Sequence, residues 1–455
     1  MIRIDVLPDE VLLGVFDFCV GSSWLEGKAR VDGWQPLVHV CRRWRSLVLE
    51  SPRRLNLRLY CTPQTPARDT LDVWPALPLM VRGYYTSLTS GTENTIAALR
   101  RSNRVCQVVL EYLKAWQLEE VLAAIQVPFP ALTDLRLKLE SEGGTLPVIQ
   151  DSFLGGSAPH LQSFSLNGIP FPGLPKLLLS ATHLVTLWLS NIPHSGYISP
   201  EAIVALISML SSLERLTLEF LSPQSRPDRR PPPSKLSVIA ALRYFHFKGV
   251  IEYLEDLVTR IDTPQLDDMD ITFFNQIDFD TQRLSQFINR TPKLGKRYGD
   301  AHVEFYSHSV VVSLPRGFLW IAISCRKLDW QLSSIEQVCN SSLYPLSTVE
   351  DLYIKDHFSR LFWENDTIEN TLWLQLLLPF TAVKNLYLSK EFAPDIAAAL
   401  QELVGGRIME VSPNLQNIFV ERLEPSGPFQ ENIAQFVAAR QISDHLIAIS
   451  VWDRP

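Results

Sequence analysis

The sequence is poor in cysteine, and its few cysteines stand far apart. The six thiols are those of Cys19, Cys41, Cys61, Cys106, Cys325 and Cys339. No two of them form a Cys-x-x-Cys pair, whereas structural zinc sites need closely spaced ligands and disulfide frameworks belong to small secreted domains. We therefore expect free thiols, no metal and no cofactor, in a chain that works inside the cell, in the cytoplasm or the nucleus.

Long apolar runs and an excess of positive charge are missing too. No stretch of eighteen or more uninterrupted apolar residues occurs, and a membrane-spanning helix needs about 20 of them. The net charge is −7, which gives no electrostatic reason to expect nucleic acid or an anionic membrane as a partner. Acids at Asp5, Asp9 and Glu10 stand where a secretory signal would need an apolar run. We expect a soluble protein.

The motifs of common enzyme classes are also absent. The sequence contains no Gly-x-x-x-x-Gly-Lys-[Ser/Thr] phosphate loop, no His-Glu-x-x-His zinc motif and no Gly-x-Ser-x-Gly nucleophile motif. Its nine histidines are scattered, without metal-ligand spacing. We expect no catalytic residues and no enzymatic activity. A hydrolase or transferase hidden in the chain would need a nucleophile, a base and an acid in one pocket.

What the sequence does contain is the composition of a folded protein, with 46% hydrophobic and 20% charged residues. Its 455 residues are about three times a typical domain length. Three zones differ in pattern: a helical zone over residues 1–52, a connecting zone with the first solenoid strands over 53–104, and a repeating zone over 105–455. The zones predict several structural parts rather than one compact core.

The first zone predicts two amphipathic helices joined by a loop. One apolar stripe, within residues 9–18, consists of Val11, Leu12, Val15 and Phe16. A second stripe, spaced by threes and fours, consists of Leu37, Val40, Cys41, Trp44, Leu47 and Val48. Residues 21–33 between the stripes are polar and flanked by glycine, which is typical of a loop.

Two segments of this zone resemble the F-box. Residues 7–11 are Leu-Pro-Asp-Glu-Val and residues 40–47 are Val-Cys-Arg-Arg-Trp-Arg-Ser-Leu, close to the family patterns Leu-Pro-x-Glu-apolar and Val-Cys-[basic]-x-Trp-[basic]-x-Leu. The resemblance covers some fifty residues. The interval from Leu7 to Cys41 is about ten residues longer than usual in that family, and the excess falls in the loop, where an insertion costs little. The resemblance implies a small helical bundle that binds the Skp adaptor of SCF-type ubiquitin ligases.

The resemblance also implies a set of adaptor-binding residues: Leu7, Pro8, Glu10, Leu12, Val15, Phe16, Leu37, Val40 and Trp44. A bundle of this size buries little surface, so we expect part of this set to stay exposed as an apolar patch that a partner covers. The partly exposed residues are expected to be Leu7, Pro8, Leu12, Val15 and Phe16. We expect Trp44 and Val40 to belong mainly to the inner core. The alternative is that residues 7–48 merely cap the repeats that follow.

From residue 105 onward the chain repeats the pattern apolar-x-x-apolar-x-apolar. Ten copies begin at Val105, Leu132, Leu161, Leu184, Leu213, Leu242, Leu266, Val349, Val383 and Leu415. The steps are 27, 29, 23, 29, 29 and 24 residues, then a gap of 83, then 34 and 32. Helical stripes such as residues 203–210 lie between the copies, and one strand plus one helix per ~20–29 residues is the leucine-rich-repeat plan. We expect an α/β fold, with an all-α F-box module followed by an irregular leucine-rich-repeat-like solenoid that has a curved parallel sheet.

Two segments interrupt the repeats. Residues 222–235 are rich in proline and arginine, which is typical of a solvated loop. The 83-residue gap contains strand-like runs at residues 303–305, 310–314 and 318–324. We expect the solenoid to continue through the gap as degenerate repeats or as a hairpin.

In each repeat, the residues between the apolar ones are expected on the exposed face of the sheet. The residues that we assign to partner binding there are Arg136, Trp188, Arg215, His246, Asp270, Tyr353, Tyr387 and Phe419. Trp188, His246, Tyr353, Tyr387 and Phe419 hold the same strand position in different repeats, and exposed aromatic residues are typical of binding hot spots. The alternative is that these rings stack on one another across the strands, or that loops cover them.

Together these features predict a non-enzymatic substrate receptor of an SCF-type cullin ubiquitin ligase, which acts in ubiquitin-dependent degradation. The expected partners are a Skp-type adaptor, through it a cullin, and a protein substrate that the repeats recruit. The layout also resembles the expanded F-box families of mushroom-forming fungi. The alternative is a non-catalytic interaction scaffold whose F-box works outside a cullin complex.

Overall fold

The structure is a computed structural model of the chain. It describes residues 6–21, 34–51, 54–55, 57–61, 71–72, 76–84, 90–140, 146–171, 176–223, 233, 235–274, 281–294, 299–314, 319–341, 343, 346–357, 369–422 and 427–452. Most of the loop expected over residues 21–33 and most of the loop expected over 222–235 lie outside these residues. In the described part of the chain, no helix is both long enough and apolar enough to cross a membrane.

Backbone packing divides the chain into two compact units. Unit 1 consists of residues 1–198 and 209–213, and unit 2 of residues 199–208 and 214–455. The division falls within the repeats. The core of the N-terminal helices also includes Leu55, Leu57 and Leu77 of the connecting zone.

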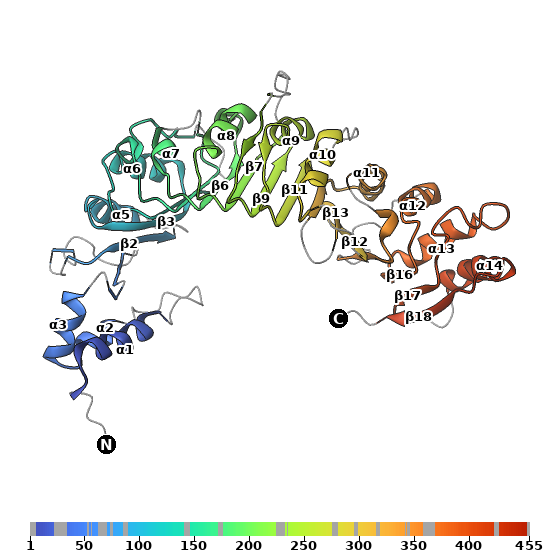
Figure 1. The fold of residues 1–455 in the computed structure, drawn as a ribbon, viewed down its shortest axis with the longest axis horizontal. Coiled ribbons are helices and arrows are strands. Elements are labelled where there is room, and N and C mark those ends of the chain that lie inside the picture. Colours follow the sequence, from blue (N-terminus) through green and yellow to red (C-terminus); the bar gives the residue numbers. More distant parts are fainter. Residues whose placement is uncertain are drawn as a thin grey trace. The chain divides into compact units, whose positions relative to one another are not determined.

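Unit 1 begins with three helices, α1 (Asp9–Gly21), α2 (Gln35–Val38) and α3 (Arg42–Glu50), which we name the N-terminal module (Figure 1). The second apolar stripe does not form one continuous helix, because the backbone is extended at Cys41, with φ −157° and ψ 172°. The Arg45 Nε donates a hydrogen bond to the Val38 carbonyl across this break, at 2.9 Å. The break turns the expected second helix into two short ones.

The core of the N-terminal module is formed by one side of α1 together with residues of α2, α3 and the following segment. Its buried members are Leu12, Leu13, Phe16, Trp34, Leu37, Val48, Leu55, Leu57 and Leu77. The expectation of partial exposure is wrong for Leu12 and Phe16, which are 1% and 0% exposed. A helix turns about 100° per residue, so Leu12 and Phe16 point inward while Val11 and Val15 point outward. Val40, which we expected in the core, is exposed.

The rest of unit 1 is a parallel sheet with the strand order β1-β2-β3-β4-β5-β6. The strands are β1 (Leu59–Cys61), β2 (Leu79–Tyr84), β3 (Val105–Leu113), β4 (Asp134–Leu139), β5 (Ser163–Asn167) and β6 (Thr186–Ile192). The helices between them are α5 (Ser90–Leu99), α6 (Ala115–Ala124) and α7 (Lys176–Ser180), with 3₁₀ turns η3 (Phe153–Gly156) and η4 (His194–Gly196). Each strand lies beside the next strand in the chain, so each repeat packs on its neighbours.

Unit 2 follows the same plan, with the strand order β7-β9-β11-β14-β13-β12-β15-β16-β17-β18. The strands are β7 (Arg215–Phe220), β9 (Tyr244–Gly249), β11 (Asp268–Phe274), β12 (Asp300–Tyr306), β13 (Ser309–Ser313), β14 (Leu319–Ser324), β15 (Asp351–Asp356), β16 (Asn385–Leu388), β17 (Asn417–Glu421) and β18 (Ala448–Trp452). The helices are α8 (Pro200–Ile207), α9 (Ile251–Val258), α10 (Gln282–Arg290), α11 (Leu328–Asn340), α12 (Asn370–Leu377), α13 (Ala393–Gln401) and α14 (Pro428–Ile442), with the 3₁₀ turn η5 (Leu346–Thr348). A separate small sheet pairs β8 (Ser237–Val238) with β10 (Ile261–Asp262).

The 83-residue gap in the repeats contains an antiparallel meander. β12 pairs with β13, and β13 pairs with β14, both in antiparallel orientation. The two outer strands of the meander join the parallel sheet, since β14 pairs with β11 and β12 pairs with β15. The expected hairpin is therefore present, with a third strand that keeps the sheet of unit 2 continuous.

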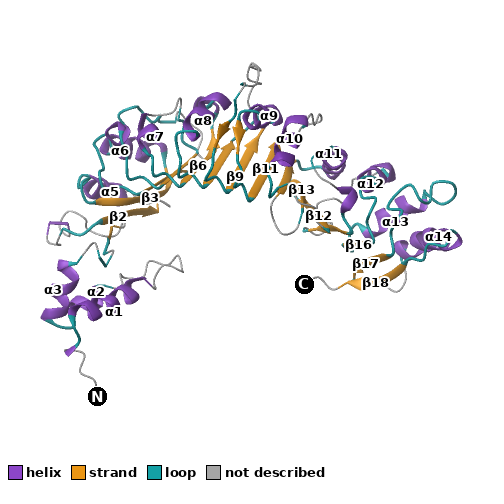
Figure 2. Ribbon diagram, in the orientation of Figure 1, coloured by secondary structure: helices purple, strands orange, loops and turns teal. Residues whose placement is uncertain are grey.

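All ten copies of the repeated pattern contain a strand. In β15, Leu352 and Ile354 are buried, whereas Asp351, Tyr353 and Lys355 between and beside them are not. The buried residues pack between the sheet and the helices, which line one face of the sheet in each unit (Figure 2). Because successive side chains of a strand point to opposite faces, the other residues lie on the face opposite the helices, which we name the open face. The mixed α/β fold with a parallel, leucine-rich-repeat-like sheet is thus confirmed.

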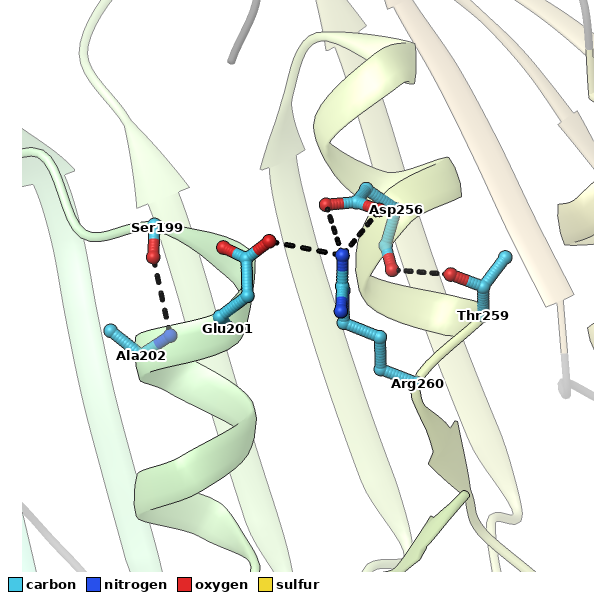
Figure 3. A network of polar contacts seen from close by, with 6 residues as sticks. All are labelled: Ser199, Glu201, Ala202, Asp256, Thr259 and Arg260. Atoms are coloured by element: carbon cyan, nitrogen blue, oxygen red, sulfur yellow. Dashed lines mark hydrogen bonds and ion pairs between the residues drawn. The ribbon is translucent and has the colours of Figure 1, made fainter. Parts of the chain in front are cut away.

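In unit 2, charged side chains tie the helices of successive repeats together (Figure 3). The Arg260 Nη2 lies 2.9 Å from Glu201 Oε1 of α8 and 3.1 Å from Asp256 Oδ1 of α9. The Glu255 carboxylate of α9 accepts hydrogen bonds of 3.1 and 2.6 Å from two backbone amides at the start of α10. Removing one partner of a buried pair destabilises a protein by about 3–5 kcal/mol. These contacts therefore hold consecutive repeats, and with them their strands, in a fixed arrangement.

Candidate protein-binding surfaces

The residues that we expected to bind an adaptor fall into two groups in the structure. The exposed or half-buried group comprises Leu7, Pro8, Glu10, Val15, Val40 and Trp44. The buried group, Leu12, Phe16 and Leu37, belongs to the core of the N-terminal module. Phe16 packs on Trp44 there, with ring centroids 4.7 Å apart. The expected contact role of the buried group is therefore corrected: these residues support the surface from inside and are not part of it.

α1 presents an apolar stripe to solvent, which we name the α1 stripe and which consists of Val11, Val15 and Phe18. The two valines are each 47% exposed, and Phe18 is 79% exposed. Their spacing of four and three residues places them on one side of the helix. Contiguous apolar surface of this kind is unfavourable in water and is typical of an interaction site.

An ion pair fixes the segment in front of α1. The Arg43 guanidinium on α3 donates to Asp9 Oδ1 through Nε at 2.9 Å and to the Leu7 carbonyl through Nη2 at 2.6 Å. Asp9 is the first residue of α1, where a carboxylate interacts favourably with the helix dipole. The pair is partly exposed, so it positions Leu7 and Pro8 at the start of the helix more than it stabilises the fold.

In unit 1, Trp188 and Tyr84 are exposed aromatic residues on the open face. Trp188 on β6 is exposed, and the residue across from it on β5 is Ser165. Arg136 on β4 is exposed and lies 3.7 Å from Glu111 Oε1 of β3. Both residues that we assigned to partner binding in unit 1 are thus accessible on the open face, and their role in binding stays a prediction.

In unit 2, the strand register places one row of open-face residues side by side. The row consists of Thr217, His246, Asp270, Trp320, Ser313, His302, Tyr353, Tyr387, Phe419 and Ser450. Neighbouring strands lie about 4.8 Å apart, so consecutive members of the row are within contact distance. Five of the eight residues assigned to partner binding lie in this row, and Arg215 lies on the same face, two residues before Thr217.

Near one end of the row, His246 lies between two carboxylates. His246 Nε2 is 3.1 Å from Glu219 Oε1, and Nδ1 is 3.7 Å from Asp270 Oδ2. The Tyr244 hydroxyl donates a hydrogen bond of 2.8 Å to the same Asp270 oxygen. Burial lowers the pKa of His246, but the two carboxylates outweigh burial and raise this pKa to about 9. The imidazole is therefore protonated at neutral pH and neutralises part of the surrounding negative charge.

Near the other end of the row, three rings stack across consecutive strands. The ring centroids of Tyr353 and Tyr387 are 4.2 Å apart, those of Tyr387 and Phe419 are 4.5 Å apart, and both pairs are tilted by only 9°. Trp452 of β18 packs on the two tyrosines, with centroids 5.9 and 5.5 Å away. The alternative that the aromatic residues stack on one another therefore holds here. Stacking takes up ring faces that a partner would otherwise contact.

Beside the stack, the Glu304 carboxylate is surrounded by donors. The Tyr306 hydroxyl donates to Glu304 Oε2 at 2.7 Å, and His357 Nε2 lies 3.3 Å from the same oxygen. His302 Nδ1 and Lys355 Nζ lie 3.5 and 3.9 Å from Oε1. The hydrogen bond from His302, opposed by burial but supported by the other three groups, lowers the pKa of Glu304 to about 2. The charge of this carboxylate is thus compensated within the protein.

Two surface residues that the structure singles out are missing from the sequence-based assignments. Phe18 completes the α1 stripe, and its spacing of seven residues from Val11 is a signal that could have found it. Trp320 on β14 is 42% exposed on the open face. It lies in the meander, outside the ten repeats, but the alternation Leu319-Trp320-Ile321 indicates that its side chain points away from the core.

No family model matches the sequence, and no curated protein matches it. Among solved structures, the chain is similar to the leucine-rich repeat-containing protein LegL7 from Legionella pneumophila, with 12% sequence identity and a TM-score of 0.27, over 84% of this chain and 97% of that chain. An identity and a TM-score this low carry no inference about partners or activity.

Proposed function

We propose that this protein is the substrate receptor of an SCF-type cullin ubiquitin ligase in the cytoplasm or nucleus. The N-terminal module docks on a Skp-type adaptor and, through it, on a cullin. The open face of the repeats recruits a protein target for ubiquitin-dependent degradation. The chain itself catalyses no step and needs no cofactor, because ubiquitin transfer in such ligases belongs to other subunits.

The observation that carries the proposal is the α1 stripe. The N-terminal module already has a core of its own, so its stability gains nothing from large apolar side chains in water. The stripe lies in the segment whose sequence resembles the F-box and directly follows Leu7 and Pro8, which Arg43 fixes in place. An adaptor that covers the stripe removes its apolar surface from water, which gives association its driving force.

The open faces of the two units support the recruiting half of the proposal. The sheet face of a solenoid is an extended surface on which a partner can be bound. Trp188 in unit 1 and Trp320 in unit 2 are exposed there, and tryptophan is among the residues that dominate binding energy at interfaces. Each unit therefore has an exposed tryptophan on its open face to which a protein target can bind.

The test is the binding of the full-length protein to a recombinant Skp adaptor, measured by isothermal titration calorimetry. We expect the variant Val11→Ser/Val15→Ser/Phe18→Ser to bind the adaptor at least about thirtyfold more weakly, because loss of a hot-spot cluster costs about 2 kcal/mol or more. Val127→Ser is the matched control, because Val127 is also 47% exposed but lies after α6, outside the N-terminal module. Adaptor affinity is expected to be unchanged in the control.

The possible outcomes separate the two functions considered. Equal adaptor affinity in the triple variant and the control would remove the α1 stripe from the interface. No adaptor binding by the folded full-length protein would contradict the ligase function and favour an interaction scaffold that works outside a cullin complex. Far-UV circular dichroism of both variants checks that the fold is intact.

A further inference from the structure

Trp320 lies beside acidic side chains on the open face of unit 2. The strand register places Asp270 of β11 directly across from it. Asp268 lies two residues earlier on the same face, and so on the diagonal from Trp320. Diagonal neighbours in a sheet are within reach of an aromatic side chain. On the other side, β13 presents Ser313 to the indole, so the flanking strands offer it a carboxylate and a hydroxyl instead of a ring to stack on.

The open face of unit 2 has an excess of negative charge. Its described strands present seven carboxylates to this side: Glu219, Asp268, Asp270, Asp300, Glu304, Asp351 and Glu421. The lysine and arginine side chains on the same strand positions are three: Arg215, Lys248 and Lys355. A surface of this charge attracts the cationic groups of a partner and repels the anionic ones.

Asp268 differs from its neighbour in that only the charge of Arg215 compensates it, and only partly, among the described residues. Asp270 has Tyr244 and His246 as partners, whereas no hydrogen bond or ion pair reaches the Asp268 carboxylate from the part of the chain that the structure describes. Burial, followed by the charge of Asp270, raises the pKa of Asp268 to about 6. The protein thus keeps this carboxylate in an unfavourable environment, and such local conflicts are typical of functional positions.

We propose that this part of the open face binds an arginine side chain of a partner protein, with the guanidinium held by Asp268 and Asp270 and stacked on the Trp320 indole. A planar guanidinium donates two hydrogen bonds to a carboxylate and stacks on an aromatic face at the same time, which the compact ammonium of lysine does not do. The contact combines an ion pair with a cation–π interaction. The inference rests on the proposed function, in which the open face recruits a protein target. It adds that the recognised segment of this target contains an arginine.

The probe is a fluorescein-labelled peptide of four Arg-Gly repeats, added to the full-length protein and followed by fluorescence anisotropy at physiological salt. The matched probe replaces each arginine with citrulline, which keeps the size and the planar end group but has no charge. We expect the arginine probe to bind and the citrulline probe to bind at least about tenfold more weakly. In the variant Asp268→Asn/Trp320→Ala, we expect the arginine probe to lose about tenfold in affinity.

The control variant is Asp329→Asn/Trp330→Ala. Trp330 on α11 is 49% exposed and follows an acidic residue, but the pair belongs to a helix and not to the open face. We expect this variant to bind the arginine probe as the unchanged protein does. Asp268→Asn alone, which keeps the shape of the side chain, serves as a second variant if the double change disturbs the fold, and its expected loss is about threefold.

Three results would overturn the proposal: no binding of the arginine probe, equal weakening in the two double variants, or equal binding of the citrulline probe. Equal weakening would show general attraction to an acidic chain. Loss of the arginine site with intact adaptor binding would leave the ligase function standing. Intact probe binding without adaptor binding would instead remove the ligase function and keep the arginine site.

Discussion

The open faces of the two units share one strand pattern but carry different balances of charge. In unit 1, strands β2 to β6 present three cationic side chains, Arg82, Arg136 and Lys138, and two carboxylates, Glu111 and Asp134. In unit 2, the described strands present seven carboxylates but only three lysine or arginine side chains and the protonated His246. One repeat plan therefore gives two chemically different surfaces, which are suited to different segments of a partner or to different partners.

The two faces also show what decides the role of an aromatic residue. Trp188 in unit 1 and Tyr353 in unit 2 hold the same position of the repeated pattern. Trp188 lies across from Ser165 and stays exposed, whereas Tyr353 lies across from Tyr387 and stacks on it. The neighbour on an adjacent strand, and not the position in the repeat, determines whether a ring supports the sheet or remains available to a partner.

The variant Tyr387→Ala tests this distinction with the largest expected effect. Tyr387 lies between the rings of Tyr353 and Phe419 and also contacts Trp452. We expect the free energy of unfolding, measured by urea denaturation, to fall by about 2–4 kcal/mol. The matched change in unit 1, Trp188→Ala, is expected to cost less than about 1 kcal/mol. Equal losses would show that the two rings have the same role.

The fold could be predicted from the sequence where burial alone determines the local structure. A leucine or isoleucine at a regular spacing indicates a buried position, and each of the ten repeats that show this spacing contains a strand. The strand order β14-β13-β12 within the sheet could not be predicted from such a spacing. Which strand pairs with which is decided by packing between distant segments, and no local pattern in residues 272–348 contains that information.

The candidate sites likewise have some features that the sequence predicts and others that only the packing of distant segments determines. Alternation along a strand is enough to place His246 and Asp270 on the open face. It is not enough to separate Leu12 from Val11 on α1, because both lie on one broad apolar stripe and the packing partner chooses the buried side. It also gives no sign that no hydrogen bond from the described residues reaches the Asp268 carboxylate, since side chains from other strands determine this.

The variant Glu304→Gln tests how strongly a carboxylate on the open face of unit 2 stabilises the fold. The pKa of Glu304 is about 2 in the folded protein, below its ordinary value of 4.5. A carboxylate with a lowered pKa stabilises the fold above its ordinary pKa, and this contribution is lost as the pH falls from about 4.5 toward 2. At pH 7 we expect the free energy of unfolding to fall by about 1–2 kcal/mol, and the difference from the unchanged protein to shrink below pH 4.5.

Glu111→Gln is the matched change in unit 1. Glu111 lies 3.7 Å from the exposed Arg136, and an exposed pair of this kind contributes less than about 1 kcal/mol. We expect a loss too small to resolve by urea denaturation. A loss as large as that of Glu304→Gln would mean that the two carboxylates are equally compensated by their neighbours. The two open faces would then differ only in how many charged side chains they carry.

The only expected gain in stability belongs to Asp268→Asn. Asp268 and Asp134 hold the same position in repeats of the two units. Asp134 Oδ2 accepts hydrogen bonds from Gln107 Nε2 at 2.9 Å and Thr133 Oγ1 at 2.6 Å. Asp268 instead lies in the field of Asp270 and Asp267, which the charge of Arg215 only partly offsets.

The sign of the effect follows from the raised pKa of Asp268, about 6 against an ordinary 3.8. Ionisation of such a group destabilises the fold progressively as the pH rises from about 4 through 6. At pH 7 we expect Asp268→Asn to raise the free energy of unfolding by up to about 1 kcal/mol after solvent screening, with no gain at pH 4, and Asp134→Asn to lower it. A gain at pH 7 alone would show that the protein keeps Asp268 charged against its own stability, as a binding group for arginine requires. No gain would mean that the charge is already compensated within the fold, and the physical reason for a partner to supply a cation would disappear.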